Sequence, residues 1–542
     1  MNAGLCLPLF ALAFGGSRNP WVFTAFALLL WGAAASRRRL PKIPVAPLWG
    51  AWLAWSAISA GVSAEPWRGL SDLAYRAAAI GIFVLALDSN REDRKAWRIF
   101  LPVAILILEA AAFFINVPSY PHVGVLYPYY NYTAAAAAVG VSFGFALVFS
   151  KEESERNLGV ACTIVSWVFL AWTGSRGGLV AASAGTMVVL IGSGRKMIAV
   201  VLAAGGLMAV VGLFAAGSPL LKLERATANL RPQLWKAAVA VASDSPILGE
   251  GPGQFDRGFL RHNFPAPQDK TLTRYGRVSK HAHSELLQEA AEIGWPGVLL
   301  LLIALAATFA RGCRQKNPEL GALGAIAALG AHGVFDNVLS LPALEWLFFS
   351  FLGAANSSEE TTEAPWPGAW IAAGVLLSIV SWWPKWLVSS ALSEGSQPAL
   401  LQAVSIAPKD PLLWENLART RLRDKDPRRA MQALVIASQL HPTEAVYPLM
   451  IAQLARNARQ WNAVLRITQR VITLEPSAPQ PRLLRAQAFL ELGRPLQARA
   501  ELEVFNRIAK PLPSIRKLKP GVRFVLGHEA GLRRALEKRL KN

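Results

Sequence analysis

Residues 197–216 read MIAVVLAAGGLMAVVGLFAA, a run of twenty residues without a charged side chain. About 20 apolar residues are enough for one helix to cross the hydrocarbon core of a bilayer. Lys196 directly precedes this run, and a long polar segment, 217–293, follows it. The run therefore predicts a membrane-spanning helix that leads into a large loop on one side of the membrane.

The composition of the whole chain is that of a polytopic membrane protein. Of its 542 residues, 53% are hydrophobic and 17% are charged, and the mean hydropathy is +0.32. Soluble domains carry roughly 25% charged residues. Several of the candidate membrane segments are short, which leaves their number open by about one or two. The thirteen candidates are 3–16, 20–35, 45–62, 72–87, 99–117, 132–149, 158–172, 177–192, 197–216, 294–310, 320–338, 343–355 and 368–388.

Lys and Arg in the short loops predict the orientation, because cytoplasmic loops carry an excess of positive charge. With the N-terminus in the cytoplasm, three cations of short loops, Arg18, Arg68 and Arg176, face outward and fifteen face inward. We therefore expect the segment 217–293 on the outer side. The fifteen inward cations are Arg37, Arg38, Arg39, Lys42, Arg91, Arg94, Lys95, Arg98, Lys151, Arg156, Arg195, Lys196, Arg311, Arg314 and Lys316.

The long outer segment is basic. Residues 217–284 contain ten Lys and Arg against five Asp and Glu. Loops of this length are usually functional or disordered. Two interpretations remain open, a basic surface that binds an anionic substrate and a solvated loop.

The C-terminal region has a 34-residue period. Pro408, Pro442 and Pro476 recur at this interval, which is the length of a tetratricopeptide repeat. Such repeats bind peptides or partner proteins, so we predict an α-solenoid over 397–510 that carries no catalysis. Val464 and Val471 replace alanines, which makes the repeats degenerate. The small residues expected between the helices are Ala418, Ala430, Ala437, Ala452, Ala486 and Ala498.

The excess of positive charge lies mainly in this region. The net charge of the chain is +21, and residues 397–542 hold 26 Lys and Arg against 11 Asp and Glu. No cluster of aromatic residues that could stack on bases accompanies them, so we expect no nucleic-acid partner. Residues 511–542 form a basic tail that either lies against anionic lipid headgroups or is solvated.

The first candidate site is Thr173-Gly174-Ser175-Arg176-Gly177-Gly178, at the start of a membrane segment. A guanidinium group and the backbone N–H groups of a helix N-terminus can bind a phosphate together. A tight turn with an arginine that reaches the membrane surface is the alternative. The candidate substrate-binding residues here are Ser175, Arg176 and Gly177.

Two further clusters lie in the long outer segment. One runs from Arg231 through Trp235 to the stretch 244–255, and the other is His281-Ala282-His283-Ser284, preceded by Lys280. Zinc needs three or four ligands, and this pair of histidines has no suitable third. An imidazole at an outer membrane surface can instead take a proton from a sugar hydroxyl.

Three polar residues fall in or near membrane segments, namely Arg76, His332 and Asp336. Ionisable groups inside a membrane are costly, so they are candidates for function. Pairing with each other or with neighbours within the helix bundle is the alternative.

Together and in this order, the three clusters resemble those of the O-antigen ligase and O-antigen polymerase superfamily of bacterial envelope glycosyltransferases. The resemblance covers most of residues 1–355 and implies twelve membrane helices, with the long outer loop between the ninth and the tenth. A thirteenth helix and a repeat domain are additions in this chain. The residues that match the motifs of the superfamily are Ser175, Arg176, Gly177, Arg231, Trp235, Pro246, Gly249, Gly251, His283, Ser284, Gly294 and Gly297.

This resemblance implies an enzyme of the bacterial inner membrane that transfers a glycan from undecaprenyl diphosphate to a hydroxyl group on the periplasmic face. His283 would be the base, and Arg176 and Arg231 would neutralise the diphosphate. His281 would position the base or the substrate. The membrane part contains no Asp-x-Asp, so no cofactor or metal requirement is expected.

The acceptor stays open among the growing glycan, lipid A–core and a protein hydroxyl. A non-catalytic repeat scaffold for a polysaccharide export machine is the alternative from a different class. In fold class we expect an all-α chain, with a membrane helix bundle over 1–390 and the repeats after it.

Overall fold

The computed structural model describes residues 2–13, 20–36, 39–116, 130–215, 230–265, 279–357, 361–363, 367–510, 512–517 and 520–541. Arg18, Arg37 and Arg38, which entered the orientation argument, lie outside these ranges, as do 217–229 and 266–278 of the long outer segment. The chain divides into two compact parts. Residues 1–255 and 281–383 form the first, here called the apolar part, and residues 256–280 and 384–542 form the second, here called the C-terminal part.

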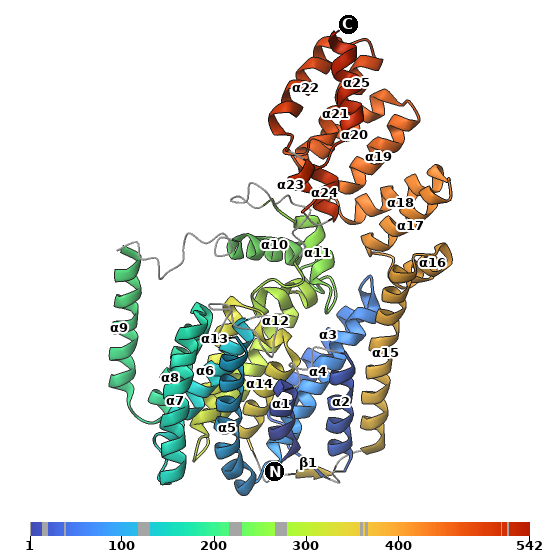
Figure 1. The fold of residues 1–542 in the computed structure, drawn as a ribbon. Coiled ribbons are helices and arrows are strands. Elements are labelled where there is room, and N and C mark those ends of the chain that lie inside the picture. The colour runs from blue at the N-terminus through green and yellow to red at the C-terminus, as the bar shows by residue number, and fades with distance from the viewer. Residues whose placement is uncertain are drawn as a thin grey trace. The chain divides into compact units, whose positions relative to one another are not determined.

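A helix covers each of the thirteen apolar stretches expected from the sequence (Figure 1). By length and composition, three of the described helical segments could cross a bilayer, namely Pro66–Leu87, Arg91–Phe114 and Glu285–Cys313. The thirteen helices are α1 (Ala3–Ala13), α2 (Pro20–Ala35), α3 (Ala46–Val62), α4 (Pro66–Leu87), α5 (Arg91–Asn116), α6 (Tyr130–Leu147), α7 (Glu153–Thr173), α8 (Arg176–Gly192), α9 (Lys196–Ala215), α12 (Glu285–Cys313), α13 (Leu320–Phe335), α14 (Pro342–Ala355) and α15 (Pro367–Glu394).

Large apolar side chains are exposed on these helices, which is what a lipid environment allows. Phe114 on α5, Val168 on α7 and Leu299 on α12 are 78%, 65% and 59% exposed. Exposed apolar surface of this kind is rare on soluble monomers. The apolar helices indicate a membrane protein, whereas the number of crossings and their direction remain predictions.

The expectation of an all-α chain needs one small correction. Two strands of three residues each, β1 (Arg39–Pro41) and β2 (Thr361–Glu363), pair antiparallel with Leu40 opposite Thr362. They lie directly before α3 and shortly before α15 in the chain. Apolar periodicity could not have predicted them, because a pairing this short leaves no alternating pattern.

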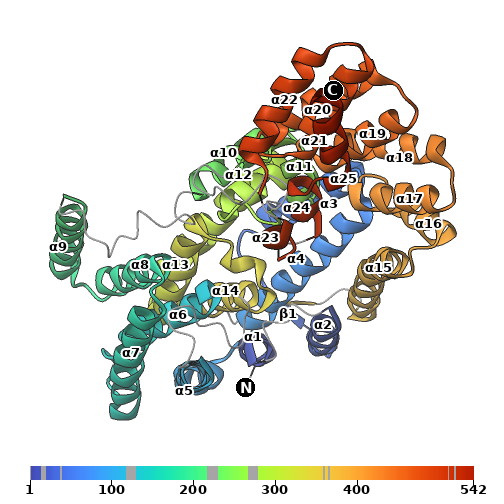
Figure 2. The same ribbon diagram turned by 45° about the horizontal axis from the view of Figure 1, so that its top comes forward.

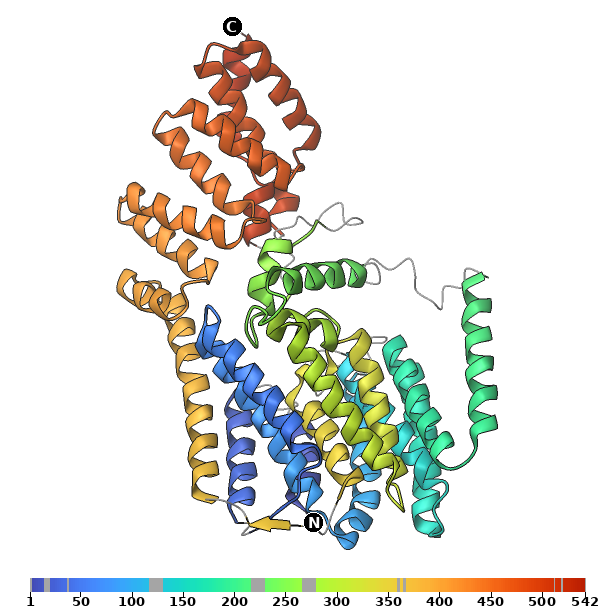
Figure 3. The ribbon, with the colours of Figure 1, turned by 180° about the vertical axis from the view of Figure 1, so that it is seen from behind.

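Helices α6, α8 and α13 pack closely through small residues (Figures 2 and 3). On α6, Ala134–Ala138 are fully buried. A Cβ atom on Gly185 of α8 would lie 2.0 Å from Ser142 Oγ and 2.5 Å from the carbonyl oxygen of Gly324. Small residues allow the backbones of membrane helices to approach in this way. The close packing fixes the ends of the three helices, where polar residues gather.

Two helices lie within the described residues of the long outer segment, α10 (Arg231–Asp244) and α11 (Phe255–His262). The first begins with Pro232 near its N-terminus, a position where the missing N–H of proline costs no hydrogen bond. Phe255, the first residue of α11, ends the first of the two segments that make up the apolar part. The remainder of α11 belongs to the C-terminal part.

The C-terminal part contains three successive pairs of helices with a common turn. The central turn residue of each pair has a positive φ, at Lys425 (61°), Arg459 (55°) and Gly493 (71°), and these positions are 34 residues apart. The alanines expected between the helices are all fully buried. A structural repeat of 34 residues is therefore present, and its assignment as a tetratricopeptide solenoid stays a prediction. The helices are α16 (Gln397–Ile406), α17 (Pro411–Arg423), α18 (Pro427–Leu440), α19 (Val446–Asn457), α20 (Trp461–Leu474), α21 (Gln480–Glu491) and α22 (Pro495–Ile508).

The region expected as a basic tail instead packs on the helix pairs. It forms α23 (Leu512–Ile515), α24 (Pro520–Leu526) and α25 (Ala530–Lys541), in which Val525 and Leu536 are buried. Glu529 accepts hydrogen bonds from Arg456 Nη1 and Gln480 Nε2, both at 2.9 Å. The many charged residues of this region made its apolar helix face hard to recognise in the sequence. The described residues form neither a lipid-bound nor a solvated tail.

Candidate functional site

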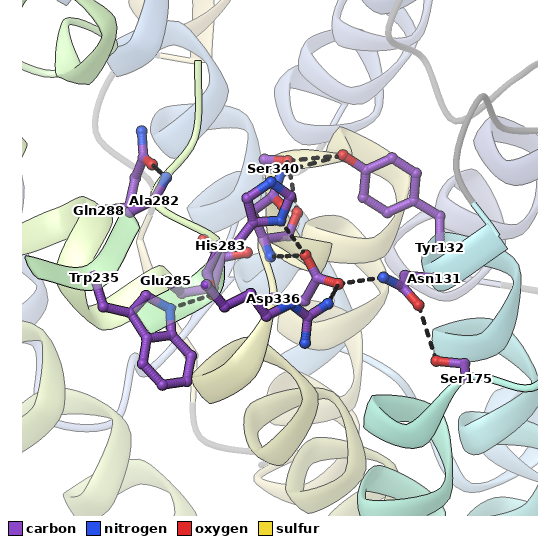
Figure 4. Close-up of polar contacts among 12 residues, drawn as sticks. Asn131, Tyr132, Ser175, Trp235, Ala282, His283, Glu285, Gln288, Asp336 and Ser340 are labelled. Carbon is purple, nitrogen blue, oxygen red and sulfur yellow. Dashed lines mark hydrogen bonds and ion pairs between the residues drawn. The ribbon is translucent and has the colours of Figure 1, made fainter. Parts of the chain in front are cut away.

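Asp336 is the centre of a polar network at the end of α13 (Figure 4). Its Oδ1 lies 2.8 Å from His283 Nδ1 and accepts from the backbone N–H of Asn337 at 3.0 Å. Its Oδ2 accepts from Arg231 Nη2 at 2.8 Å and also from Asn131 Nδ2. Residues from four distant stretches of the sequence therefore meet on one carboxylate.

The surroundings keep this carboxylate ionised. Asp336 follows the last residue of α13 and is 4% exposed. The guanidinium of Arg231, the imidazole of His283 and the N–H of Asn337 all contact this carboxylate, and such partners favour its ionised form. An ionised Asp336 can stabilise a positive charge on the imidazole.

His283 is held in an unusual backbone conformation. Its φ is 53°, a left-handed value that is uncommon for a residue other than glycine. Trp235 Nε1 donates to its carbonyl oxygen at 3.0 Å, and the preceding N–H, that of Ala282, donates to Gln288 Oε1 at 2.7 Å. The imidazole is 37% exposed. Within the described residues its Nε2 has no partner, so this nitrogen remains available to a substrate.

The spacing of Arg231 and Trp235 puts both side chains on one face of α10. Residues four apart in a helix are neighbours on its surface. From this face Arg231 reaches the Asp336 carboxylate and Trp235 reaches the His283 carbonyl. The sequence predicted Arg231 as a ligand of the diphosphate, and the structure shows that it is also ion-paired. One bond to Asp336 leaves other N–H groups of the guanidinium for a substrate.

The turn before α8 joins the same network. Ser175 is the N-cap of α8, where its Oγ accepts from the N–H of Gly178 at 3.1 Å. The Ser175 hydroxyl donates to Asn131 Oδ1 at 2.9 Å, and Asn131 in turn donates to Asp336. Arg176 is the first residue of α8 and is exposed. The first and third sequence clusters are thereby connected by a chain of hydrogen bonds.

A kink in α12 explains the glycines of the second and third clusters. Pro296 has no N–H to donate to the carbonyl of Glu292, and Gly251 N donates to that carbonyl at 2.9 Å instead. Gly294 has φ 73° and ψ 171°, and a Cβ on it would lie 2.1 Å from the carbonyl oxygen of Ile247. The loop 246–251 thus packs against the kink, which requires glycine at the points of closest approach.

Two other candidate residues, Arg76 and His332, are not hydrogen-bonded to Asp336. Arg76 pairs through all three guanidinium nitrogens, with Asp72 at 2.6 Å and with Glu289 at 2.8 and 2.9 Å, which is the bundle-pairing alternative. His332 is fully buried beside Gly177, where a Cβ would lie 2.8 Å from its Nε2. Neither of its ring nitrogens has a hydrogen-bond partner within the described ranges, so it does not pair with the Asp336 carboxylate.

The remaining candidates lie beside the network in sequence. His281 is partly buried and precedes His283 by two residues. Lys280 is exposed and belongs to the C-terminal part of the chain, so it is not a member of the network described here. Gly177 lies close to His332, which is not hydrogen-bonded to the network.

Sequence reasoning missed several residues of the site. Asn131 bridges Ser175 and Asp336 by hydrogen bonds. The sequence feature that could have identified it is an amide side chain at the start of an alanine-rich helix. Glu285 accepts from the N–H of Leu339 at 2.7 Å and holds the turn after Asp336. Glu285, Gln288 and Glu292 follow helical spacing on one face of α12, which is a recognisable pattern.

The described residues contain no group of three His, Cys, Asp or Glu side chains close enough to hold a metal ion. Independence from metals remains a prediction.

A comparison with known proteins adds family evidence. No curated protein matches the chain. Residues 161–302 match the model of a protein family described as O-antigen ligase. The matched stretch contains Arg176, Arg231 and His283, whereas Asn131 and Asp336 lie outside it. Over these residues the chain is similar to the O-antigen ligase family.

Proposed function

We propose that this protein transfers a glycan from undecaprenyl diphosphate to a hydroxyl acceptor on the periplasmic face of the bacterial inner membrane. The observation that carries the proposal is the arrangement of His283, whose Nδ1 lies 2.8 Å from the anionic Asp336 while its Nε2 is open to a substrate. A neutral imidazole fixed in this way donates from Nδ1 and accepts a proton at Nε2.

In the proposed reaction, His283 Nε2 takes the proton from the acceptor hydroxyl as its oxygen attacks the anomeric carbon of the donor glycan. The bond from that carbon to the diphosphate oxygen breaks, and its electron pair leaves with the diphosphate. Attack from the face opposite the leaving group inverts the anomeric configuration. Asp336 stabilises the protonated His283, which then returns its proton to water.

The arginines would stabilise the leaving group. Negative charge grows on the diphosphate as the glycosidic bond breaks, and guanidinium groups are well suited to bind phosphate oxygens. Arg231 is held by Asp336, and Arg176 stands at the N-terminus of α8, where backbone N–H groups also favour an anion. Ser175 and Gly177 belong to the same turn, and we assign His281 and Lys280 to substrate positioning.

Separate binding and rate measurements test these roles. His283→Ala should lower the transfer rate about 10²–10⁴-fold and leave binding of the lipid diphosphate donor intact, because the lost group is a base. Arg231→Ala and Arg176→Ala should lower the rate about 10²–10³-fold and weaken donor binding. Lys236→Ala, an exposed cation on α10, is the matched control and should keep both properties. A His283→Ala enzyme near the wild-type rate would overturn the proposal.

Two further measurements address the cofactor and the acceptor. Activity should persist in EDTA, and a loss that a divalent ion reverses would contradict the proposed mechanism. In a deletion strain, single-unit chains indicate a polymerase, full-length chains retained on the carrier indicate a ligase, and loss of glycan from proteins indicates a protein O-oligosaccharyltransferase. Unchanged glycans would contradict a transferase role.

A further inference from the structure

The Glu292 carboxylate fixes the N-terminal end of α11. Its Oε2 accepts from the N–H of Gly253 at 2.7 Å, and its Oε1 accepts from the N–H of Phe255 at 3.3 Å. Glu292 is 4% exposed, so these hydrogen bonds are shielded from water. A buried carboxylate needs such donors, and here they come from Gly253, two residues before α11, and from Phe255, its first residue.

The same carboxylate is bonded to the loop that carries His283. Gln288 lies one turn before Glu292 on α12, and its Nε2 donates to Glu292 Oε1 at 2.6 Å. The other atom of this amide, Gln288 Oε1, accepts from the N–H of Ala282 at 2.7 Å (Figure 4). One amide side chain therefore connects the peptide before His283 to the carboxylate that holds α11.

We propose that Gln288 and Glu292 are positioning residues for His283. The inference rests on the proposed function, because it assumes that His283 acts as the base. The left-handed backbone of His283 persists only when its surroundings hold it, and the Ala282–Gln288 bond is one of the contacts that do so. Glu292 in turn holds the Gln288 amide in place, because it accepts a hydrogen bond from Gln288 Nε2.

The following experiment separates a positioning role of Gln288 from a merely structural one. Gln288→Ala should lower kcat, by up to about 10²-fold, while the KM for the donor and the thermal midpoint of the purified protein change little. In the exchange variant Gln288→Glu/Glu292→Gln, the new carboxylate at 288 can accept from Ala282 N–H, and the new amide at 292 can accept from Gly253 N–H. The amide can also donate to the carboxylate, which keeps a hydrogen bond between the two side chains. This variant should recover most of the lost kcat. An unchanged kcat in Gln288→Ala would overturn the positioning role.

The outcomes distinguish this inference from the proposed function. If His283→Ala is inactive while Gln288→Ala retains the wild-type kcat, the base stands and the positioning role is wrong. If His283→Ala is itself active, the proposed function fails first, and the positioning role fails with it.

Discussion

At the scale of single residues, the site depends on a histidine whose two ring nitrogens have different environments. Nδ1 faces the Asp336 carboxylate and Nε2 has no protein partner within the described residues. The carboxylate favours the tautomer with its proton on Nδ1, and it would compensate the positive charge that His283 gains if it acts as the proposed base. Asp336 also binds Arg231, so one residue positions the base and a candidate ligand of the leaving group.

Replacing this carboxylate by an amide should therefore impair the base more than the fold. Asp336→Asn keeps the size of the side chain but removes its charge, so we expect the transfer rate to fall about 10²–10⁴-fold, while donor binding persists. The double variant His283→Ala/Asp336→Asn should be no slower than His283→Ala, because the two residues act as a unit. Single-turnover rates on purified protein measure both effects, and rate losses that multiply would show that Asp336 acts independently.

The sequence predicted those site residues that stand in recognisable motifs. His283, Arg231 and Ser175 were found in this way, and Asp336 was found because a carboxylate near a membrane segment is costly. Asn131 escaped notice, although it bonds to Asp336 across 205 positions of the chain. Such a contact is created only by the packing of α6 against α13, which no local pattern reports. The pairing of Arg76 with Glu289 was missed as a specific contact for the same reason.

At the scale of elements, the kinked helix α12 organises the site. It carries the residues that hold α11 and the loop 246–251, and its first turn follows directly after His283. The helix boundary itself was predicted at Gly294, whereas the structure extends it back to Glu285. The sequence around Gly294 and Pro296 is typical of a helix start, and these residues instead produce a kink.

Gly294 should tolerate no side chain. Its φ and ψ lie in a region essentially restricted to glycine, so Gly294→Ala should lower the free energy of unfolding by about 1–3 kcal/mol or more. Gly330 of α13 is the matched control, because a Cβ there meets no atom within 4 Å. Gly330→Ala should leave stability nearly unchanged, and thermal unfolding in detergent measures both variants. Equal midpoints for the two would show that the kink is not required.

The buried alanines of the C-terminal part make a second prediction at this scale. Ala430 packs against the neighbouring helices and is 0% exposed to solvent. Ala430→Trp should therefore overpack the helix interface and destabilise the C-terminal part by about 1–3 kcal/mol. Gln432→Trp places the same side chain on the exposed face of α18 and is the control. Proteolysis at increasing urea concentration measures the difference. In folded protein the transfer chemistry should survive, and an abolished turnover would show that this interface belongs to the active site.

At the scale of the whole molecule, the pattern of apolar runs located thirteen helices, because burial in lipid and in protein both require apolar side chains. It did not locate α10, which lies in the long outer segment. The same pattern says nothing of which helix ends meet. The 34-residue period of the C-terminal part could be recognised because its prolines and alanines recur. The packing of 512–541 on the repeat helices could not, because the sequence of this region is dominated by charged residues. Sequence periodicity thus predicted elements, whereas the contacts among distant residues came from the structure.

The orientation of the chain is the last prediction, and it follows from charge rather than from packing. The excess of Lys and Arg in alternate short loops puts the N-terminus in the cytoplasm, and nine preceding helices then bring α10 and α11 to the periplasmic side. A reporter fused after Gln254 should therefore read periplasmic, and one after Gln315 cytoplasmic. A fusion after Gln397 should read periplasmic, because α15 would be the thirteenth crossing. If the first two fusions report the same side, the charge argument is wrong, and a cytoplasmic signal after Gln397 alone would place the C-terminal helices inside.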